Sequence, residues 1–398
     1  MEIIYISSAC NPENIEEINK TAISKLEISG IKFHNLLIRG FAENNIEVNS
    51  IIGLPISKKT NKKIFWRKKV DKKDKIKYHQ VGFINLPILK QLTTAINIFL
   101  TFIKVAKKKE KVCTVVDATY VSVLPFILLA NKFVHTKIVA IVADIYDYMC
   151  DVDNSNGKAN MLKRWLRNKN KKRYLKMNGF ILLTEQMNEV INLNKMPYVV
   201  IEGCSDSKMN DLKNVEKNKK RIVLYSGKLS EKFGIKLLIE ALKKIKQDDV
   251  ELWIYGDGEA KDYVKEEAQK SNKIIYKGLV SNREVVEAQM QATLLINPRP
   301  TNQQYTKYSF PSKNIEYMAS GTPMLTTILP GMPKEYCDYV YLIKDESING
   351  LYKAIDDVLK LPNNILEEKG RQAKEFIMQN KNERIQAKKI LKFLERVN

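Results

Sequence analysis

Residues 221–234 read Arg221-Ile-Val-Leu-Tyr-Ser-Gly-Lys-Leu-Ser-Glu-Lys-Phe-Gly234. The stretch begins with a mostly apolar run of strand length, passes through a turn at Gly227 and leads into helical spacing from Ile235. Similar segments alternate after it: strands Val250–Tyr255, Lys273–Tyr276 and Thr293–Ile296, and helices Ile235–Ile245, Ala260–Lys270 and Arg283–Gln291. Buried-type strands separated by helices predict a parallel sheet covered on both faces. The second half is therefore expected to be a doubly wound, Rossmann-like domain.

The first half shows the same alternation. Its expected strands are Glu2–Ser7, Val112–Val116, Lys137–Val142 and Phe180–Thr184. Its expected helices are Phe33–Asn44, Val121–Phe133 and Leu162–Leu175. The polar segment Ser205–Lys220 predicts the linker. The expected parts are an N-terminal domain (1–205), a C-terminal domain (206–375) and a helix (376–398) that packs back on the N-terminal domain. The predicted fold class is α/β, with two Rossmann-like parallel-sheet domains facing a central cleft.

The composition narrows the class of protein. Of 398 residues, 44% are hydrophobic and 28% charged, which excludes a disordered or fibrous chain. Five cysteines without a C-x-x-C pair and three histidines argue against a disulfide framework and a structural zinc site. Neither a signal peptide nor a membrane-spanning stretch is recognised, so a cytoplasmic protein is expected. The net charge of +22 implies an anionic partner.

Two glycine turns suit close approach of a ligand. Gly227 and Lys228 lie between an expected strand and an expected helix, where a glycine, a cation and a helix N-terminus together suit a phosphate group. Gly256 and Gly258 follow the next strand. An ordinary strand-to-helix turn and a plain tight turn remain the alternatives for these two segments.

The segment after the fourth strand of this domain is polar and leads into a short helix. That helix is expected to begin after Pro311 and to end at Gly321. Ser312 and Lys313 fall in its first turn, which favours an anion. Glu316 lies further along, where its carboxylate could accept two hydroxyls of a ribose or could simply pair with Lys313.

The three segments, in this order and spacing, resemble the retaining glycosyltransferases of family 4, which have the GT-B fold. The matching residues are Gly227-Lys228-Leu229…Phe233-Gly234, then Gly256-Asp257-Gly258, then Tyr308…Glu316 followed by Met318-Ala-Ser-Gly-Thr-Pro323. The resemblance is specific over roughly residues 221–360. It implies that Glu316 binds the ribose of a nucleotide-sugar donor and that the backbone at Leu279 faces the base. It also implies that Lys228 binds the donor's diphosphate, without a metal ion or cofactor.

Three residues depart from the family's pattern. Lys228 replaces an arginine and loses its planar fork. Phe233 stands in place of a second phosphate-binding lysine, and Tyr308 in place of the first glutamate of Glu-x7-Glu. We hypothesise that the missing cation is supplied by one of three residues: Arg299, Lys307 or Lys313.

In the N-terminal domain, Asp144 follows the expected strand Lys137–Val142 and is the expected acceptor-side residue. His34 is expected to begin a helix after a polar loop over Ser8–Lys32. It could touch acceptor or donor, or cap a helix or be partly buried. Asp151-Val-Asp153 has the form of a metal-binding D-x-D motif, but it lacks calcium-loop spacing and lies in the acceptor-side domain, so no metal site is expected.

The positive charge is concentrated in two segments. Lys58–Lys77 holds eleven Lys and Arg against two aspartates and is expected to be a mobile loop. Lys158–Lys176 holds nine and no acid, with an apolar stripe at helical spacing. These segments suit an anionic membrane surface, although the second could be a surface helix whose stripe is core. Nucleic acid is not expected, because no recognition motif is present.

Together these features predict a retaining, metal-independent glycosyltransferase of polysaccharide biosynthesis at the inner face of the cell membrane. The expected donor is a UDP-sugar, with a GDP-sugar second, and the expected acceptor is a glycan or a lipid-linked sugar. Lys228, Glu316 and Asp144 are the residues expected to carry the chemistry. The alternatives are a nucleotide-sugar 2-epimerase of the same fold and a non-catalytic membrane-binding scaffold.

Overall fold

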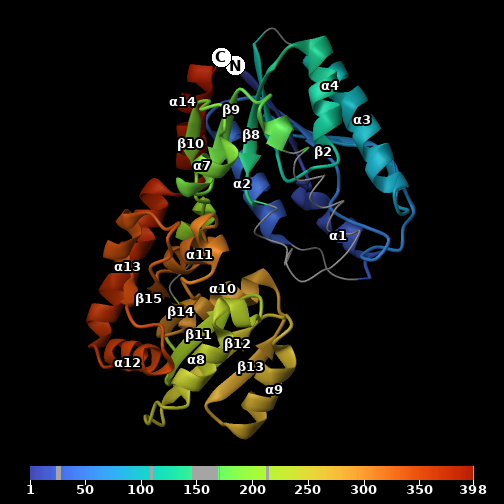
Figure 1. Ribbon diagram of the computed structural model, residues 1–398. Coiled ribbons are helices and arrows are strands. Elements are labelled where there is room, and N and C mark those ends of the chain that lie inside the picture. The colour runs from blue at the N-terminus through green and yellow to red at the C-terminus, as the bar shows by residue number, and fades with distance from the viewer. Residues whose placement is uncertain (24–27, 108–110, 146–168, 170, 212–214, 398) are drawn as a thin grey trace. The chain divides into compact units, whose positions relative to one another are not determined.

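The computed structural model describes residues 1–23, 28–107, 111–145, 169, 171–211 and 215–397 (Figure 1). The chain divides into two units. The first comprises Met1–Cys204 and Glu383–Asn398, and the second comprises Ser205–Asn382. The sequence analysis had placed the corresponding divisions after residues 205 and 375. Among the described residues, no helix is both long and apolar enough to cross a bilayer.

The first unit is built on a sheet in the order β10-β9-β8-β7-β1-β2-β5-β4. Its strands are β1 (Glu2–Ser7), β2 (Val48–Ile52), β4 (Lys69–Lys73), β5 (Ile76–Gln80), β7 (Val112–Asp117), β8 (Lys137–Val142), β9 (Gly179–Leu182) and β10 (Tyr198–Val200). All neighbours pair in parallel except β4 with β5. β3 (Phe65–Trp66) and β6 (Phe83–Ile84) form a separate antiparallel pair. Four of these strands were predicted from their apolar runs.

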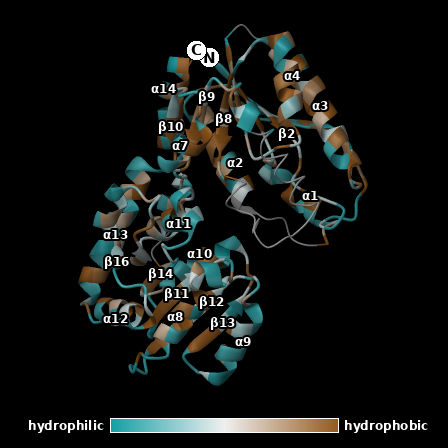
Figure 2. Ribbon diagram, in the orientation of Figure 1, coloured by the Kyte–Doolittle hydropathy of each residue, from teal (hydrophilic) through white to brown (hydrophobic). Residues whose placement is uncertain are grey.

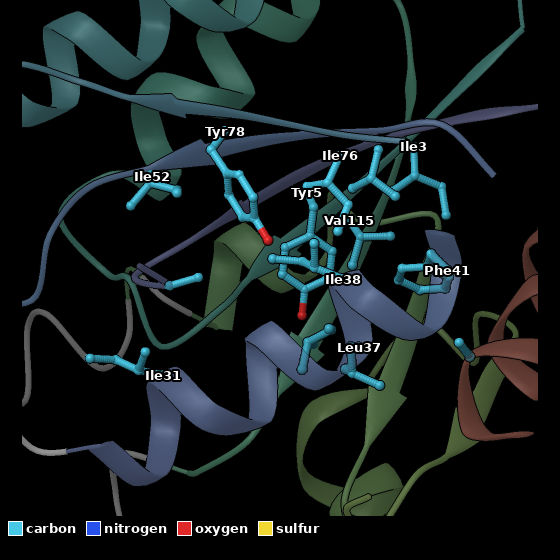
Figure 3. Packing of buried hydrophobic residues seen from close by; sticks show 14 of the residues in the cluster. Ile3, Tyr5, Ile31, Leu37, Ile38, Phe41, Ile52, Ile76, Tyr78 and Val115 are labelled. Atoms are coloured by element: carbon cyan, nitrogen blue, oxygen red, sulfur yellow. The ribbon is translucent and has the colours of Figure 1, made fainter. Parts of the chain in front are cut away.

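One face of this sheet is covered by helices from both ends of the chain. α2 (Ile28–Glu43) and α14 (Glu383–Val397) pack on each other and share one hydrophobic core with the sheet. Figure 3 shows Ile3 and Tyr5 of β1 and Val115 of β7 in this core with Leu37, Ile38 and Phe41 of α2. The C-terminal helix therefore completes the first unit.

The remaining helices of the first unit are α1 (Ile15–Asn19), α3 (Leu89–Ala106), α4 (Leu124–Val134) and α7 (Gln186–Ile191). α3 packs on α4 and contacts β2. Two predictions for this unit were wrong. Lys58–Lys77 is not a loop, because it contains β3, β4 and the start of β5. Ser8–Lys32 is not one polar loop, because it contains a 3-10 turn at Pro12–Asn14, α1 and the start of α2.

The second unit has a parallel sheet in the order β13-β12-β11-β14-β15-β16. Its strands are β11 (Arg221–Ser226), β12 (Val250–Tyr255), β13 (Ile274–Gly278), β14 (Leu294–Asn297), β15 (Met324–Thr327) and β16 (Tyr341–Ile343). The direction of progression reverses between β11 and β14. In open α/β sheets this switch point is where loops from neighbouring strands diverge and leave room for a ligand.

The helices of the second unit are α8 (Ile235–Leu242), α9 (Lys261–Lys270), α10 (Asn282–Gln291), α11 (Ser312–Ser320), α12 (Ile348–Leu359) and α13 (Asn363–Asn380). 3-10 turns at Ser207–Asp211, Glu231–Phe233, Gln304–Lys307 and Lys334–Tyr339 join them to the strands. Two hydrophobic clusters divide these helices between the faces of the sheet. The prediction of a doubly wound domain is confirmed.

Candidate active site

The carboxyl ends of three neighbouring strands of the second unit close with glycines that hydrogen-bond in series. The N–H of Gly227, after β11, donates to the carbonyl of Tyr255 at 2.8 Å. The N–H of Gly256, after β12, donates to the carbonyl of Gly278 at 2.9 Å. Gly256 has a φ of +130°, and a Cβ there would overlap with the Gly227 carbonyl, so no other residue fits without rearrangement. The carboxyl end of the sheet is therefore lined by tightly packed backbone with no side chains at these glycines.

The helix α11 is fastened to this surface. The hydroxyl of Tyr317 accepts from the Ser226 N–H at 2.7 Å, and it also lies 3.2 Å from the Ser226 carbonyl. This contact brings the first turn of α11 over the turn at Gly227. A Cβ on Gly227 would overlap with Nζ of Lys313, so the glycine makes room for the lysine. Two segments almost ninety residues apart thus meet at one point.

A second cation lies beside Lys313. Arg299 follows β14, and its guanidinium lies over the ring of Phe233, 4.4 Å from the centroid, with Tyr305 at 5.8 Å. Its Nε is buried and has no hydrogen-bond partner among the residues that the structure describes. Burial lowers the pKa of Arg299. Burial also lowers the pKa of Lys313 to about 8, a shift that Glu316 opposes and Arg299 reinforces.

The Glu316 carboxylate stands on the same helix as Lys313. It accepts a hydrogen bond from Nε2 of Gln289 at 3.1 Å, and this amide also lies 3.3 Å from Oγ of Ser226. Gln289 is fully buried in α10. Gln289, Ser226 and Tyr317 were not predicted as site residues, because nothing in the local sequence pattern distinguishes a buried amide or hydroxyl that holds a site residue from one that fills space.

The other residues predicted to bind the donor differ in how far they are buried. Gly258 touches Leu229, where a Cβ would overlap with the leucine carbonyl. Lys228, Lys307, Ser312 and Leu279 are exposed, and Tyr308 is half-buried after the turn Gln304–Lys307. Three cations were proposed to replace the missing lysine. The structure brings two of them together, Arg299 and Lys313.

In the first unit, a chain of buried polar groups lies at the carboxyl end of the sheet. Tyr5 Oη is 2.8 Å from Nδ1 of His34, and Nε2 of His34 is 3.1 Å from the Asp117 carboxylate. Thr119 donates to Asp117 through its N–H and its hydroxyl, at 2.9 and 2.6 Å. Burial would raise the pKa of Asp117, but His34 and Thr119 outweigh it and hold that pKa below the ordinary value.

Asp144 follows β8, the strand next to β7, and is half-buried. Burial, and then the charge of Asp117, raise the pKa of Asp144 to about 6. His34 lies inside α2 rather than at its start, and it is 3% exposed with both ring nitrogens in contact with partners. Asp117 and Tyr5 were not singled out from the sequence, because each lies in an apolar strand that looks like ordinary core.

Some residues singled out from the sequence lie outside the described ones. Asp151 and Asp153 do so, as does most of Lys158–Lys176. Within the described residues, no group of three or more His, Cys, Asp and Glu side chains is placed to hold a metal ion.

Solved structures share this fold over nearly the whole chain. Sucrose-phosphate synthase from Thermosynechococcus elongatus is 13% identical with a TM-score of 0.68, covering 100% of this chain and 99% of its own. Anabaena HepE, solved in complex with UDP, is 13% identical with a TM-score of 0.62, covering 100% of both chains. An alpha,alpha-trehalose-phosphate synthase (UDP-forming) from Burkholderia xenovorans is 9% identical with a TM-score of 0.66, covering 98% of this chain and 99% of its own. The GT-B fold predicted from the sequence is confirmed.

The family follows from the sequence itself. Residues 207–383 match the family described as Glycosyl transferases group 1. These residues make up nearly the whole second unit. The second unit is therefore a group 1 glycosyltransferase domain, and the protein is a glycosyltransferase, as the three loops predicted. No curated protein sequence matches the chain.

Proposed function

We propose that the protein is a retaining, metal-independent glycosyltransferase that moves a sugar from a UDP-sugar to a lipid-linked or glycan acceptor. The observation that carries the proposal is the contact of Lys313, in the first turn of α11, with the turn at Gly227. A glycine turn, a helix N-terminus and an ammonium group at one point are what a diphosphate requires.

The two cations support a diphosphate ligand on electrostatic grounds. Arg299 and Lys313 repel each other, and burial of each disfavours its charge. A diphosphate between them would offset both costs, and Arg299 Nε would gain the acceptor that it lacks. Negative charge grows on the leaving diphosphate as the glycosidic bond breaks, so the same cations would stabilise the transition state more than the bound donor.

Glu316 is proposed to accept the ribose hydroxyls. The hydrogen bond from the buried Gln289 holds this carboxylate in place, and the two oxygens of a carboxylate can accept both hydroxyls of a diol. Leu279 follows Gly278, and the backbone at this point is proposed to face the base. UDP is favoured because HepE binds it and the Burkholderia xenovorans synthase is named for forming it.

Asp144 is proposed to meet the acceptor hydroxyl. Its raised pKa, about 6, lets it exchange a proton near neutral pH. His34 is proposed to act through Asp117 rather than on the acceptor, because both of its nitrogens are engaged within the unit. The basic residues of Lys58–Lys77 are proposed to hold the protein peripherally at the inner face of the cell membrane, in a surface-polysaccharide pathway.

The test is to incubate the protein with UDP- and GDP-sugars, with and without membrane lipid extract, and to follow nucleotide release. We expect lipid-dependent release of UDP that is lost in Glu316→Ala. Exposed Glu266→Ala, on α9 of the same unit, is the matched control. An epimerised donor without acceptor would support the epimerase instead. Vesicle binding without any turnover or UDP binding would support the scaffold.

A further inference from the structure

The outer face of α3 and α4 carries an apolar surface that the proposed function does not use. Large side chains between 41% and 58% exposed stand on it: Leu89, Leu92, Ile96, Leu100, Leu129 and Phe133. We call these six residues the α3–α4 face. Figure 2 shows hydrophobic colouring along both helices, which lie side by side.

The α3–α4 face is continuous rather than scattered. On α3, the exposed residues recur at intervals of three and four, which places them on one side of the helix. On α4, Leu129 and Phe133 are four apart and so are neighbours. The ring of Phe133 meets that of Phe99 edge to face, with centroids 6.3 Å apart, so the two helices join at this surface. Singly exposed apolar residues are normal, but a joined stripe marks an interaction site.

The described residues of α3 and α4 carry positive charges and no negative ones. The sequence holds no aspartate or glutamate from Lys75 to Lys107 or from Ala118 to Ala143. Exposed lysines stand beside the apolar side chains: Lys104 and Lys107 on α3, and Lys132 on α4. Such a surface suits negatively charged lipid headgroups around an apolar interior.

The basic segment 58–68 lies at the N-terminal end of α3. Asn85, four residues before α3, donates to the carbonyl of Lys63 at 3.0 Å, and β3 pairs with β6. Phe65 of β3 is 69% exposed. Ile88, just before α3, is 82% exposed and has a φ of +66°, a conformation that β-branched residues avoid. Apolar side chains and cations thus continue past the end of the helix.

We propose that the α3–α4 face inserts into the headgroup region of an anionic bilayer, with the segment 58–68 binding the headgroups beside it. This deepens the membrane association proposed above and rests on that part of the proposed function. It adds that apolar contact, as well as charge, holds the protein on the lipid. A purely electrostatic attachment through the segment 58–68 would not involve the apolar side chains of the α3–α4 face.

The test is cosedimentation of the full chain with vesicles of phosphatidylcholine and phosphatidylglycerol, and with vesicles of phosphatidylcholine alone. The variant Leu92→Gln/Leu100→Gln/Leu129→Gln changes only exposed side chains and leaves the Phe99–Phe133 contact in place, so the fold should persist, and circular dichroism checks this. We expect its partition coefficient on the anionic vesicles to fall about tenfold or more. The matched control is Leu193→Gln/Ile365→Gln, which removes exposed apolar side chains elsewhere and should bind as wild type.

UDP binding by the same variants, measured by calorimetry, separates the two proposals, because it should remain unchanged. Unchanged vesicle binding of the triple variant would overturn the inference while leaving the glycosyltransferase proposal standing. A wild-type protein that binds no anionic vesicles would overturn both membrane proposals. A wild-type dimer that the triple variant converts to a monomer, with vesicle binding intact, would assign the α3–α4 face to a second copy and overturn the inference.

Discussion

Phe233 stands where the family's pattern has a lysine, and its ring lies against the guanidinium of Arg299. We propose that Arg299 supplies the cation that the family's pattern has at residue 233, and that the aromatic ring holds its guanidinium in place. We expect Phe233→Leu to weaken UDP binding by about two- to thirtyfold, since a cation–π contact is worth about 0.5–2 kcal/mol. Calorimetry measures this. An unchanged affinity would mean that Arg299 does not depend on the ring.

Asp144 should make the first unit less stable as pH rises. Its folded-state pKa, about 6, lies above the ordinary value of 3.8, so the folded state binds this proton more tightly than the unfolded state. The stability that results is present at low pH and is lost as pH rises through about 6. We expect Asp144→Asn to be more stable than wild type by about 1–3 kcal/mol near pH 8 and nearly equal near pH 4. Urea unfolding at both pH values tests this, and a pH-independent difference would contradict it.

Among helices, the contact of α2 with α14 depends on Gly40. A Cβ there would overlap with the carbonyl of Glu383 and touch Ala387. We expect Gly40→Ala to destabilise the protein by about 1–3 kcal/mol, because the helices must separate. Gly30→Ala, on the same helix with open space around it, should instead stabilise by about 0.5–1 kcal/mol. Thermal unfolding of the two variants compares them, and a stabilised Gly40→Ala would refute the close contact.

The predictable elements were those whose sequence carries an apolar pattern. β1, β7, β8 and β11 are buried on both faces, and their apolar runs predicted them. β4 was not predicted, because Lys69–Lys73 is an exposed edge strand and nearly all of its residues are charged. Charges on an edge strand disfavour pairing with other chains, but they also remove the apolar pattern by which a strand is predicted. The two glycine turns and the helix that begins after Pro311 lie where the sequence predicted them. The hydrogen bond between Tyr317 and Ser226 could not be predicted, because the two residues lie far apart in the sequence and meet only in the folded chain.

For the molecule as a whole, the net charge of +22 should make membrane binding depend on salt. We expect the fraction bound to phosphatidylglycerol-containing vesicles to fall severalfold between about 0.05 M and about 0.5 M NaCl, because salt screens exposed charges. A remaining fraction at high salt is expected from the α3–α4 face. Cosedimentation across the salt series measures both the salt-sensitive fraction and the fraction that remains bound at high salt. Salt-independent binding would rule out the basic residues as headgroup contacts.

Also at the scale of the whole molecule, donor binding is proposed to depend on one point, where the turn after β11 and the first turn of α11 meet a diphosphate. The most direct test is calorimetric titration of UDP into wild type, Lys313→Ala and Lys353→Ala, the last a matched exposed lysine on α12 of the same unit. We predict that Lys313→Ala weakens UDP binding by about 10- to 150-fold, the value of one charge-assisted hydrogen bond, and that Lys353→Ala does not. Equal affinities of all three proteins for UDP would contradict the account.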